Sequence, residues 1–241
     1  MLVCVLLIVG ISMGDRSLAE TGDYLSPISV VAGVDGKVLY IAEATANQIA
    51  VFDIASGKVT RVISVGENPV GLDISSDGSK LYVTSAVPAG KVQIIDVRDG
   101  SVTDNIAVGH TPVGVVGHPD GKTLYVCNQF NNNIGVVDLG SKKQVATIAV
   151  NREPVAATLT SDGKFLFVAN HLPTGPANAD YCASVISVVN TASKNVIENI
   201  DLPDGSTNVR GITISPDGRN AYVAHLLGRY QFPVTYLEKA G

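Results

Sequence analysis

The chain alternates short apolar runs with polar turns, and this pattern returns about every 42 residues. Asp-Gly pairs mark the repeat at intervals of 42, 43, 42 and 55 residues; they begin at Asp35, Asp77, Asp120, Asp162 and Asp217. Glycine accepts the positive φ that a two-residue hairpin turn requires, and the Asp side chain caps the turn. The pattern therefore predicts a hairpin at each Asp-Gly pair.

Four strands are predicted in each repeat. A run with an aromatic in register follows each turn, at 39–42, 81–84, 124–127, 166–169 and 221–224. The strand before the turn opens on Pro-Val-Gly or a variant of it, at 69–71, 112–114, 154–156 and 209–211. A third strand ends in Asp or Asn at 53, 96, 138 and 190, and a fourth follows at 59–65, 102–108, 145–150 and 196–202. Four strands at this period are typical of propeller blades, whereas ankyrin and tetratricopeptide repeats are shorter and helical. The predicted fold class is all-β, a β-propeller of four-stranded antiparallel blades.

Two of the turn segments resemble the hallmark of the YVTN β-propeller repeat family. They read Ser-Pro-Asp-Gly-Arg-Asn-Ala-Tyr-Val-Ala at 215–224 and His-Pro-Asp-Gly-Lys-Thr-Leu-Tyr-Val-Cys-Asn at 118–128. The resemblance covers about residues 24–241 and implies the fold more than any chemistry, because the motif residues build blades. Members and relatives of the family include surface-layer proteins, periplasmic propellers, lactonase-like propellers and the propeller subunits of quinoprotein amine dehydrogenases.

The repeats divide the chain into blades at about 24–66, 67–109, 110–151 and 152–206, with a partial blade at 207–241. The partial blade has an inner strand at 211–215 and a second strand at 220–225. Propellers close with four to eight blades, and relatives of this family usually close with seven. We therefore expect about four and a half blades of seven, in a fragment of a longer protein. The alternative is a half-propeller that a partner chain completes.

The N-terminus carries the pattern of an export signal. An apolar run at 2–13 is followed by polar residues and by small residues at Ser17 and Ala19, which predicts a signal peptide at 1–19 and a periplasmic or secreted protein. The run is shorter than the roughly 20 residues of a membrane helix, so no membrane span is expected after cleavage. A buried strand or an anchor are the alternatives, and the lack of a positive charge before the run leaves the true start codon open.

Composition and charge exclude two classes of protein. Hydrophobic residues make up 46% of the chain, which excludes intrinsic disorder. The formal net charge is −5 and the 17 Lys and Arg residues are scattered, which argues against a nucleic-acid partner. The mature chain keeps Cys127 and Cys182, which neighbouring blades present on one face. A disulfide between them and two free thiols both remain open.

Candidate binding residues gather on the face formed by the blade-linking loops and the loops between second and third strands. Blade four has an insertion there at 171–182, and a similar departure begins at 225. Insertions confined to one face are typical of a binding surface. The candidate binding face comprises Arg152, Asn170, His171, Asp180, Tyr181, Arg210, His225 and Arg229.

The chemistry expected on this face is the attraction of an anion. Arg210 replaces the small or apolar residue at the start of an inner strand, where a guanidinium is suited to hold a carboxylate or to bridge to a partner. Arg152 lies in the preceding blade-linking loop, and the pair is the candidate anion-attracting feature; a salt bridge to Glu153, Asp180 or Asp204 is the alternative. His171 and His225 lack a third ligand, so no metal site is predicted. No catalytic triad, phosphate loop or pair of catalytic carboxylates stands out, so no catalytic residue is assigned.

The function expected is that of an exported binding and scaffold module. The stretch 222–235 resembles the corresponding loop of bacterial YVTN propellers that are fused to, or encoded with, dihaem cytochrome c peroxidase-like domains. This implies a protein partner such as a c-type cytochrome domain. The segment has no Cys-x-x-Cys-His motif, so any haem is expected in a missing C-terminal domain. The alternative is a propeller enzyme of the lactonase or quinoprotein dehydrogenase type, with its catalytic residues in the missing blades.

Overall fold

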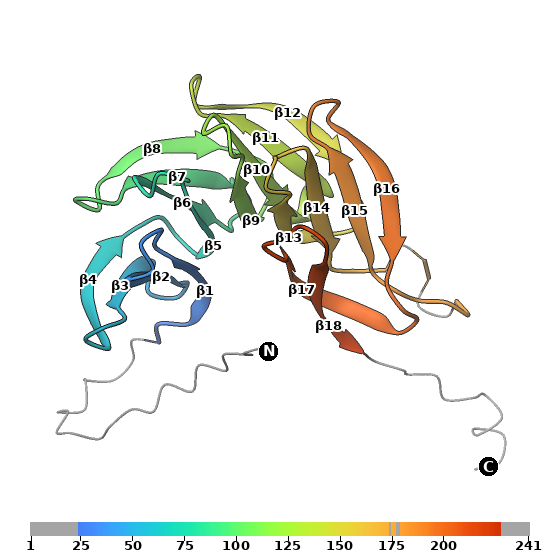
Figure 1. The fold of residues 1–241 in the computed structure, drawn as a ribbon, viewed down its shortest axis with the longest axis horizontal. Coiled ribbons are helices and arrows are strands. Elements are labelled where there is room, and N and C mark those ends of the chain that lie inside the picture. The colour runs from blue at the N-terminus through green and yellow to red at the C-terminus, as the bar shows by residue number, and fades with distance from the viewer. Residues whose placement is uncertain (1–23, 174, 177–178, 228–241) are drawn as a thin grey trace, which may run out of the picture.

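The computed structural model describes residues 24–173, 175–176 and 179–227. Within these residues the chain forms four four-stranded antiparallel sheets and one two-stranded sheet. The sheets are arranged as blades around a common axis (Figure 1), with the fourth strands at the outer rim. The all-β propeller architecture predicted from the repeats is confirmed. The predicted signal peptide and Arg229 lie outside the described residues.

The strands follow the chain order within every blade. Blade 1 holds β1 (Pro27–Ala32), β2 (Val38–Glu43), β3 (Gln48–Asp53) and β4 (Lys58–Ser64), and blade 2 holds β5 (Pro69–Ile74), β6 (Lys80–Ser85), β7 (Lys91–Asp96) and β8 (Val102–Ala107). Blade 3 holds β9 (Pro112–Gly117), β10 (Thr123–Asn128), the short 3-10 helix η1 (Gln129–Asn131), β11 (Asn133–Asp138) and β12 (Lys143–Ala149). Blade 4 holds β13 (Pro154–Leu159), β14 (Phe165–Asn170), β15 (Val185–Asn190) and β16 (Asn195–Asp201), and blade 5 holds β17 (Ser206–Ile214) and β18 (Ala221–Leu227).

The Asp-Gly turns are longer than the predicted two-residue loops. In blade 2 the Ser75 N–H donates to the Lys80 carbonyl, so four residues lie between this pair. Gly78 has a φ of 71°, as the prediction requires. The Ser75 hydroxyl donates to the Asp77 carboxylate at 2.6 Å, which closes the turn internally. A hydroxyl at the Ser75 position thus extends the cap that the Asp provides.

The inner strands approach one another closely at the axis, and a glycine makes this possible. A Cβ built on Gly71 of β5 would lie 2.1 Å from the Val113 carbonyl oxygen of β9. Beside it, the Thr84 hydroxyl accepts a hydrogen bond from the Gly71 N–H at 2.7 Å and donates to the Val113 carbonyl at 3.1 Å. The small residue of the Pro-Val-Gly motif therefore serves the packing of one blade against the next.

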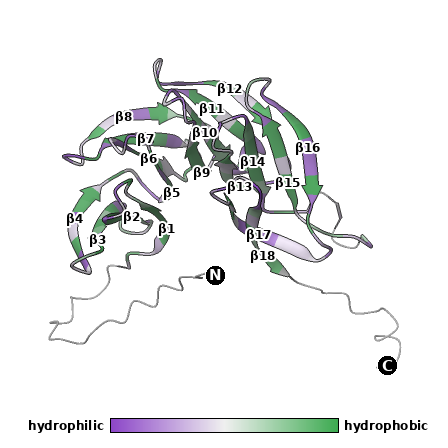
Figure 2. Cartoon of the chain, viewed as in Figure 1, coloured by the Kyte–Doolittle hydropathy of each residue, from purple (hydrophilic) through white to green (hydrophobic). Residues whose placement is uncertain are grey.

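The hydrophobic core lies between the blades. The core between blades 1 and 2 joins Tyr40 and Ile49 to Leu81 and Ile95, all buried, and similar clusters follow at the later junctions. Figure 2 shows apolar residues along the strands and polar residues at the turns. The motif aromatic packs toward the next blade, because burying large apolar surface there stabilises the stack of sheets.

Candidate functional site

A cavity of about 490 Å³ opens at the upper end of the inner strands. The upper face is defined here as the face of the blade-linking loops and of the loops between second and third strands. The cavity walls come from β1, β5, β9, β13 and β17, and Gln129 and His171 reach it from two upper loops. Among the described residues that line it, Arg210 alone carries a permanent charge. A cavity lined mostly by apolar side chains and by one guanidinium suits a ligand or side chain that carries a negative charge.

The orientation of His171 is fixed by three hydrogen bonds. Its ring Nδ1 lies 3.0 Å from the Val209 carbonyl oxygen. Because a carbonyl only accepts, this nitrogen carries the hydrogen, and Nε2 is left for another partner. Its backbone N–H donates to the Glu153 carbonyl, and its own carbonyl accepts from the Ser184 hydroxyl at 3.0 Å. His171 thus lies in the wall of the axial cavity, and its role in binding stays a prediction.

The insertion of blade 4 is held against the loop that links β16 to β17. The Cys182 N–H donates to the Asp204 carboxylate at 3.0 Å, and the Tyr181 hydroxyl donates to the Leu202 carbonyl. On the other side, the Arg152 guanidinium donates to the Pro173 carbonyl at 3.3 Å. The insertion is therefore anchored on the upper face beside the cavity.

The predicted pair of arginines has two separate roles. Arg210 lines the axial cavity, whereas Arg152 is outside its lining and supports the insertion. Neither forms a salt bridge within the described part of the chain. Asp204, one of the acids considered as their partner, instead accepts from a backbone N–H of the insertion.

The remaining residues of the predicted binding face differ in their exposure to solvent. Asn170 is fully buried, and its amide donates to the Val185 carbonyl at 2.8 Å and the Ser187 hydroxyl at 3.1 Å, so it braces blade 4 and does not face solvent. Tyr181 is half exposed, and Asp180 is exposed on the insertion. His225 lies on β18, with its Nδ1 3.4 Å from the Leu226 carbonyl oxygen. The exposed part of the predicted face is thus narrower than the sequence suggested.

Cys127 and Cys182 are both free in the structure, which therefore shows no disulfide between them. Cys127 is buried under the inner strands of blades 3 and 4, with its sulfur 3.1 Å from a Cβ built on Gly114. Cys182 contacts the loop leading to blade 5 through its bond to Asp204. Burial raises the pKa of the Cys127 thiol to about 12.

Sequence reasoning missed Asp73, an acid inside the inner strand β5. Its carboxylate accepts from the Gly117 N–H of β9 at 2.7 Å and from the Ile74 N–H at 2.9 Å. Burial raises the pKa of Asp73. The sequence feature that could have identified it is its position, because Asp73 stands in the strand where the next blade has Val116. Asp73 lines a lower axial cavity of about 320 Å³ and joins two inner strands.

The described residues contain neither a metal-binding cluster nor a membrane-spanning helix. No three His, Cys, Asp or Glu side chains there are grouped so that they could hold a metal ion. No helix in the same part of the chain has the length and apolarity to cross a membrane.

Comparison with known proteins identifies the class of fold. No family model and no curated protein matches the sequence. Among solved structures, a chain of hydrazine synthase from Kuenenia stuttgartiensis matches with a TM-score of 0.79 and 27% identity. The match covers 92% of this chain, which spans 62% of the length of that chain. In all, 1440 chains of solved structures match, and so widespread a fold does not by itself define a function.

Proposed function

We propose that this chain is an exported propeller of the YVTN type that serves as a binding and scaffold module and docks a redox protein on its upper face. The observation that carries the proposal is the place of Arg210, at the axial cavity and on the same face as the anchored insertion. The leader pattern at 1–19 supports export, and the repeat motifs support the family.

The class of partner rests on two similarities. The stretch 222–235 resembles the loop of propellers associated with dihaem cytochrome c peroxidase-like domains. A chain of similar architecture occurs in hydrazine synthase. In this proposal the haem belongs to the partner or to a further domain, and the described blades supply the surface that orients it.

The recognition chemistry follows from the charge on the face. A guanidinium offers several fixed N–H donors and is the preferred partner of a carboxylate at protein interfaces. Arg210 is exposed on its strand, so an acidic side chain can reach it from above. Charge pairs of this kind raise the association rate and weaken as salt is added.

Binding to an acidic monohaem c-type cytochrome tests the proposal. Surface plasmon resonance at low and physiological ionic strength measures the dissociation constant for the unmodified chain and for the double variant Arg152→Gln/Arg210→Gln. We expect binding that weakens with salt and a loss of roughly three- to tenfold in the double variant. Arg98→Gln, at a side chain that is 85% exposed on the opposite face, is the matched control. Equal binding by all three proteins contradicts the docking face.

The proposed association with a haem domain has a separate test. The reading frame downstream of residue 241 is expected to encode Cys-x-x-Cys-His motifs, either in the same frame or in an adjacent one. A downstream region that encodes only further blades, with no haem protein nearby, removes the support for a cytochrome partner.

A further inference from the structure

At two blade junctions, a charged side chain crosses from one blade to the next. The residues that carry these bridges occupy one register position on the fourth strand: Arg61 lies opposite Val51, and Asp104 lies opposite Ile94. The Arg61 guanidinium donates to the carbonyls of Val97 and Arg98, at 2.7 and 3.1 Å, in the turn after β7. The Asp104 carboxylate pairs with the Lys142 amine, at 2.6 Å, from the turn after β11.

At the third junction, between blades 3 and 4, only one of the two residues of such a bridge is present. The equivalent register position, opposite Val136, is Ala146. Lys194 occupies in the turn after β15 the place that Lys142 has in the turn after β11, and both have the left-handed backbone, with φ of 57° and 55°. Within the described residues Lys194 has no ion-pair partner. The lysine of the pair is kept, and its acid is replaced by a methyl group.

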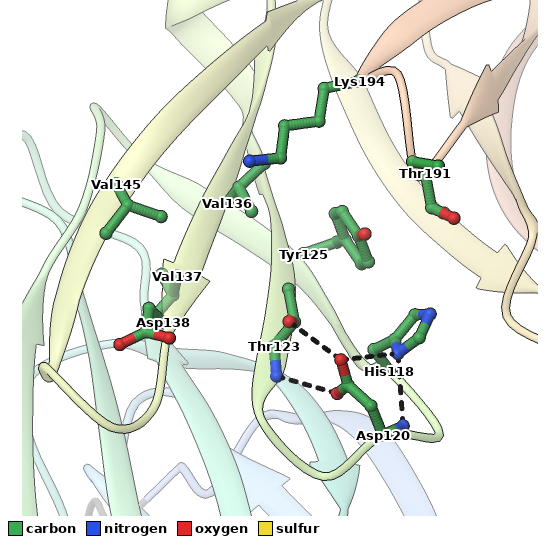
Figure 3. Close-up of a pocket in the computed structure, with 11 residues that line it drawn as sticks. His118, Asp120, Thr123, Tyr125, Val136, Val137, Asp138, Val145, Thr191 and Lys194 are labelled. Carbon is green, nitrogen blue, oxygen red and sulfur yellow. Dashed lines mark hydrogen bonds and ion pairs between the residues drawn. The ribbon is translucent and has the colours of Figure 1, made fainter.

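A cleft of about 350 Å³ occupies this junction. Figure 3 shows the Lys194 side chain extended toward Val136, with His118, Asp120 and Thr123 grouped at the other end. Val136 and Val145 provide apolar wall between the two ends. The volume is at the small end of the range of ligand sites, about 300–1,000 Å³, and suits one molecule of monosaccharide size.

The polar groups at the far end accept hydrogen bonds. One oxygen of the Asp120 carboxylate accepts from the Lys122 and Thr123 N–H groups at 2.7 and 3.1 Å. Its other oxygen accepts from the Thr123 hydroxyl at 3.3 Å and lies 3.1 Å from the His118 ring. Asp138 uses one carboxylate oxygen to accept from the Ser141 N–H at 2.6 Å. Hydrogen bonds from Ser141 hold the pKa of Asp138 below its usual value, so it is ionised at neutral pH. A carboxylate oxygen can accept two hydrogen bonds, so one site remains on the second Asp120 oxygen and the second Asp138 oxygen accepts none from the described residues; both are suited to ligand hydroxyl groups.

We propose that the cleft between blades 3 and 4 binds a sugar acid, with the ligand carboxylate on the Lys194 amine and ligand hydroxyls on Asp120 and Asp138. The ligand carboxylate takes the place that Asp104 has at the preceding junction. The carbon face of the sugar ring contacts Val136 and Val145. A neutral sugar leaves Lys194 unpaired, and a small inorganic anion leaves the carboxylate end without a donor. The site lies on the lower side of the blades and is distinct from the upper axial cavity.

Titration with D-glucuronate, followed by two-dimensional amide NMR on the full chain, tests this assignment. D-glucose and acetate are the comparison ligands. We expect saturable shifts at Thr191 and Lys194 with glucuronate and much weaker effects with the other two. Lys194→Gln is expected to lower the affinity roughly tenfold, because it removes a charged hydrogen bond. Lys142→Gln, at the equivalent lysine of the preceding junction, is the matched control and is expected to bind as the unmodified chain does.

A second variant tests whether Lys194 binds the ligand because its acidic partner is absent at this junction. Ala146→Asp restores the acid that Asp104 provides at the preceding junction, so the protein's own carboxylate competes for Lys194. We expect loss of glucuronate binding of roughly tenfold or more with unchanged far-ultraviolet circular dichroism. If this variant fails to fold, Lys194→Gln alone decides. The proposal is overturned if glucuronate does not bind, if Lys194→Gln binds it equally well, or if glucose or acetate binds as tightly as glucuronate.

Discussion

Replacing Gly71 by alanine tests whether the motif glycine serves the contact between blades. The added Cβ would lie 2.1 Å from the Val113 carbonyl oxygen and 2.8 Å from the Thr84 hydroxyl oxygen, both closer than non-bonded atoms approach. The first of these atoms belongs to a neighbouring strand and cannot rotate away. β5 and β9 must therefore separate, and the bridge through Thr84 is weakened with them.

The expected cost is the sum of opposing effects. Overpacking of a buried site costs about 1–3 kcal/mol, and weakening one hydrogen bond adds about 1 kcal/mol. The smaller entropy of the unfolded alanine chain returns about 0.4–1 kcal/mol. We expect Gly71→Ala to lower the free energy of unfolding by about 1–3.5 kcal/mol. For a chain of this size that corresponds to a fall of roughly 2–14 °C in melting temperature.

The same motif position in blade 5 supplies the control. A Cβ built on Gly211 meets no atom within 4 Å, and the Cβ on Gly114 meets Val155 O at 2.9 Å. Thermal and urea unfolding, followed by circular dichroism, should rank Gly71→Ala as the most destabilised and Gly114→Ala as intermediate. Gly211→Ala should be near neutral or slightly stabilised. If Gly71→Ala lies within about 0.5 kcal/mol of the unmodified chain, or if Gly211→Ala is destabilised equally, the glycine does not serve the contact between blades.

Three further predictions follow from individual groups. In the folded chain, a thiol reagent should label Cys182 but spare Cys127, whose pKa is raised to about 12 by burial. Both should react after unfolding without reductant, and the loss of both reactive thiols would show a disulfide between them. The pKa of Asp77 is lowered to about 2 by hydrogen bonds from Ser75 and Ser79, so its contribution to stability is present above its ordinary value and is lost as the pH falls through about 2. Ser75→Ala should move the Asp77 carboxyl titration, measured by carbon NMR, toward higher pH, and an unmoved titration contradicts this origin. Arg61→Ala should lower the free energy of unfolding in urea by about 1–3 kcal/mol, because the Arg61 guanidinium bridges blades 1 and 2. Arg98→Ala is the control, since the Arg98 side chain pairs with Asp96 inside blade 2. An equal effect of the two substitutions would show that the bridge between the blades contributes nothing.

The candidate sites could be predicted from the sequence only in part. His171 and Arg210 were identified because they depart from a regular repeat, and both line the axial cavity. Asn170 was assigned to the same face, but the last residue of β14 turns into the blade and is buried. The role of Lys194 was not visible, because it depends on Ala146 in a different blade, and a linear sequence does not show which residues face each other across a junction.

The structure of each single blade can be predicted from its own repeat. Local hydrogen bonds close each Asp-Gly turn, and the alternation of apolar residues assigns each strand, so a repeat of about 42 residues predicts its own sheet. The contacts between one blade and the next are visible only in the folded chain. The close contact at Gly71, the bridge from Lys142 to Asp104 and the open cleft at Lys194 all join residues about 38 or more positions apart. Blades similar in sequence pattern are thereby given different junctions, because a junction depends on two side chains that only the packing of whole sheets brings together.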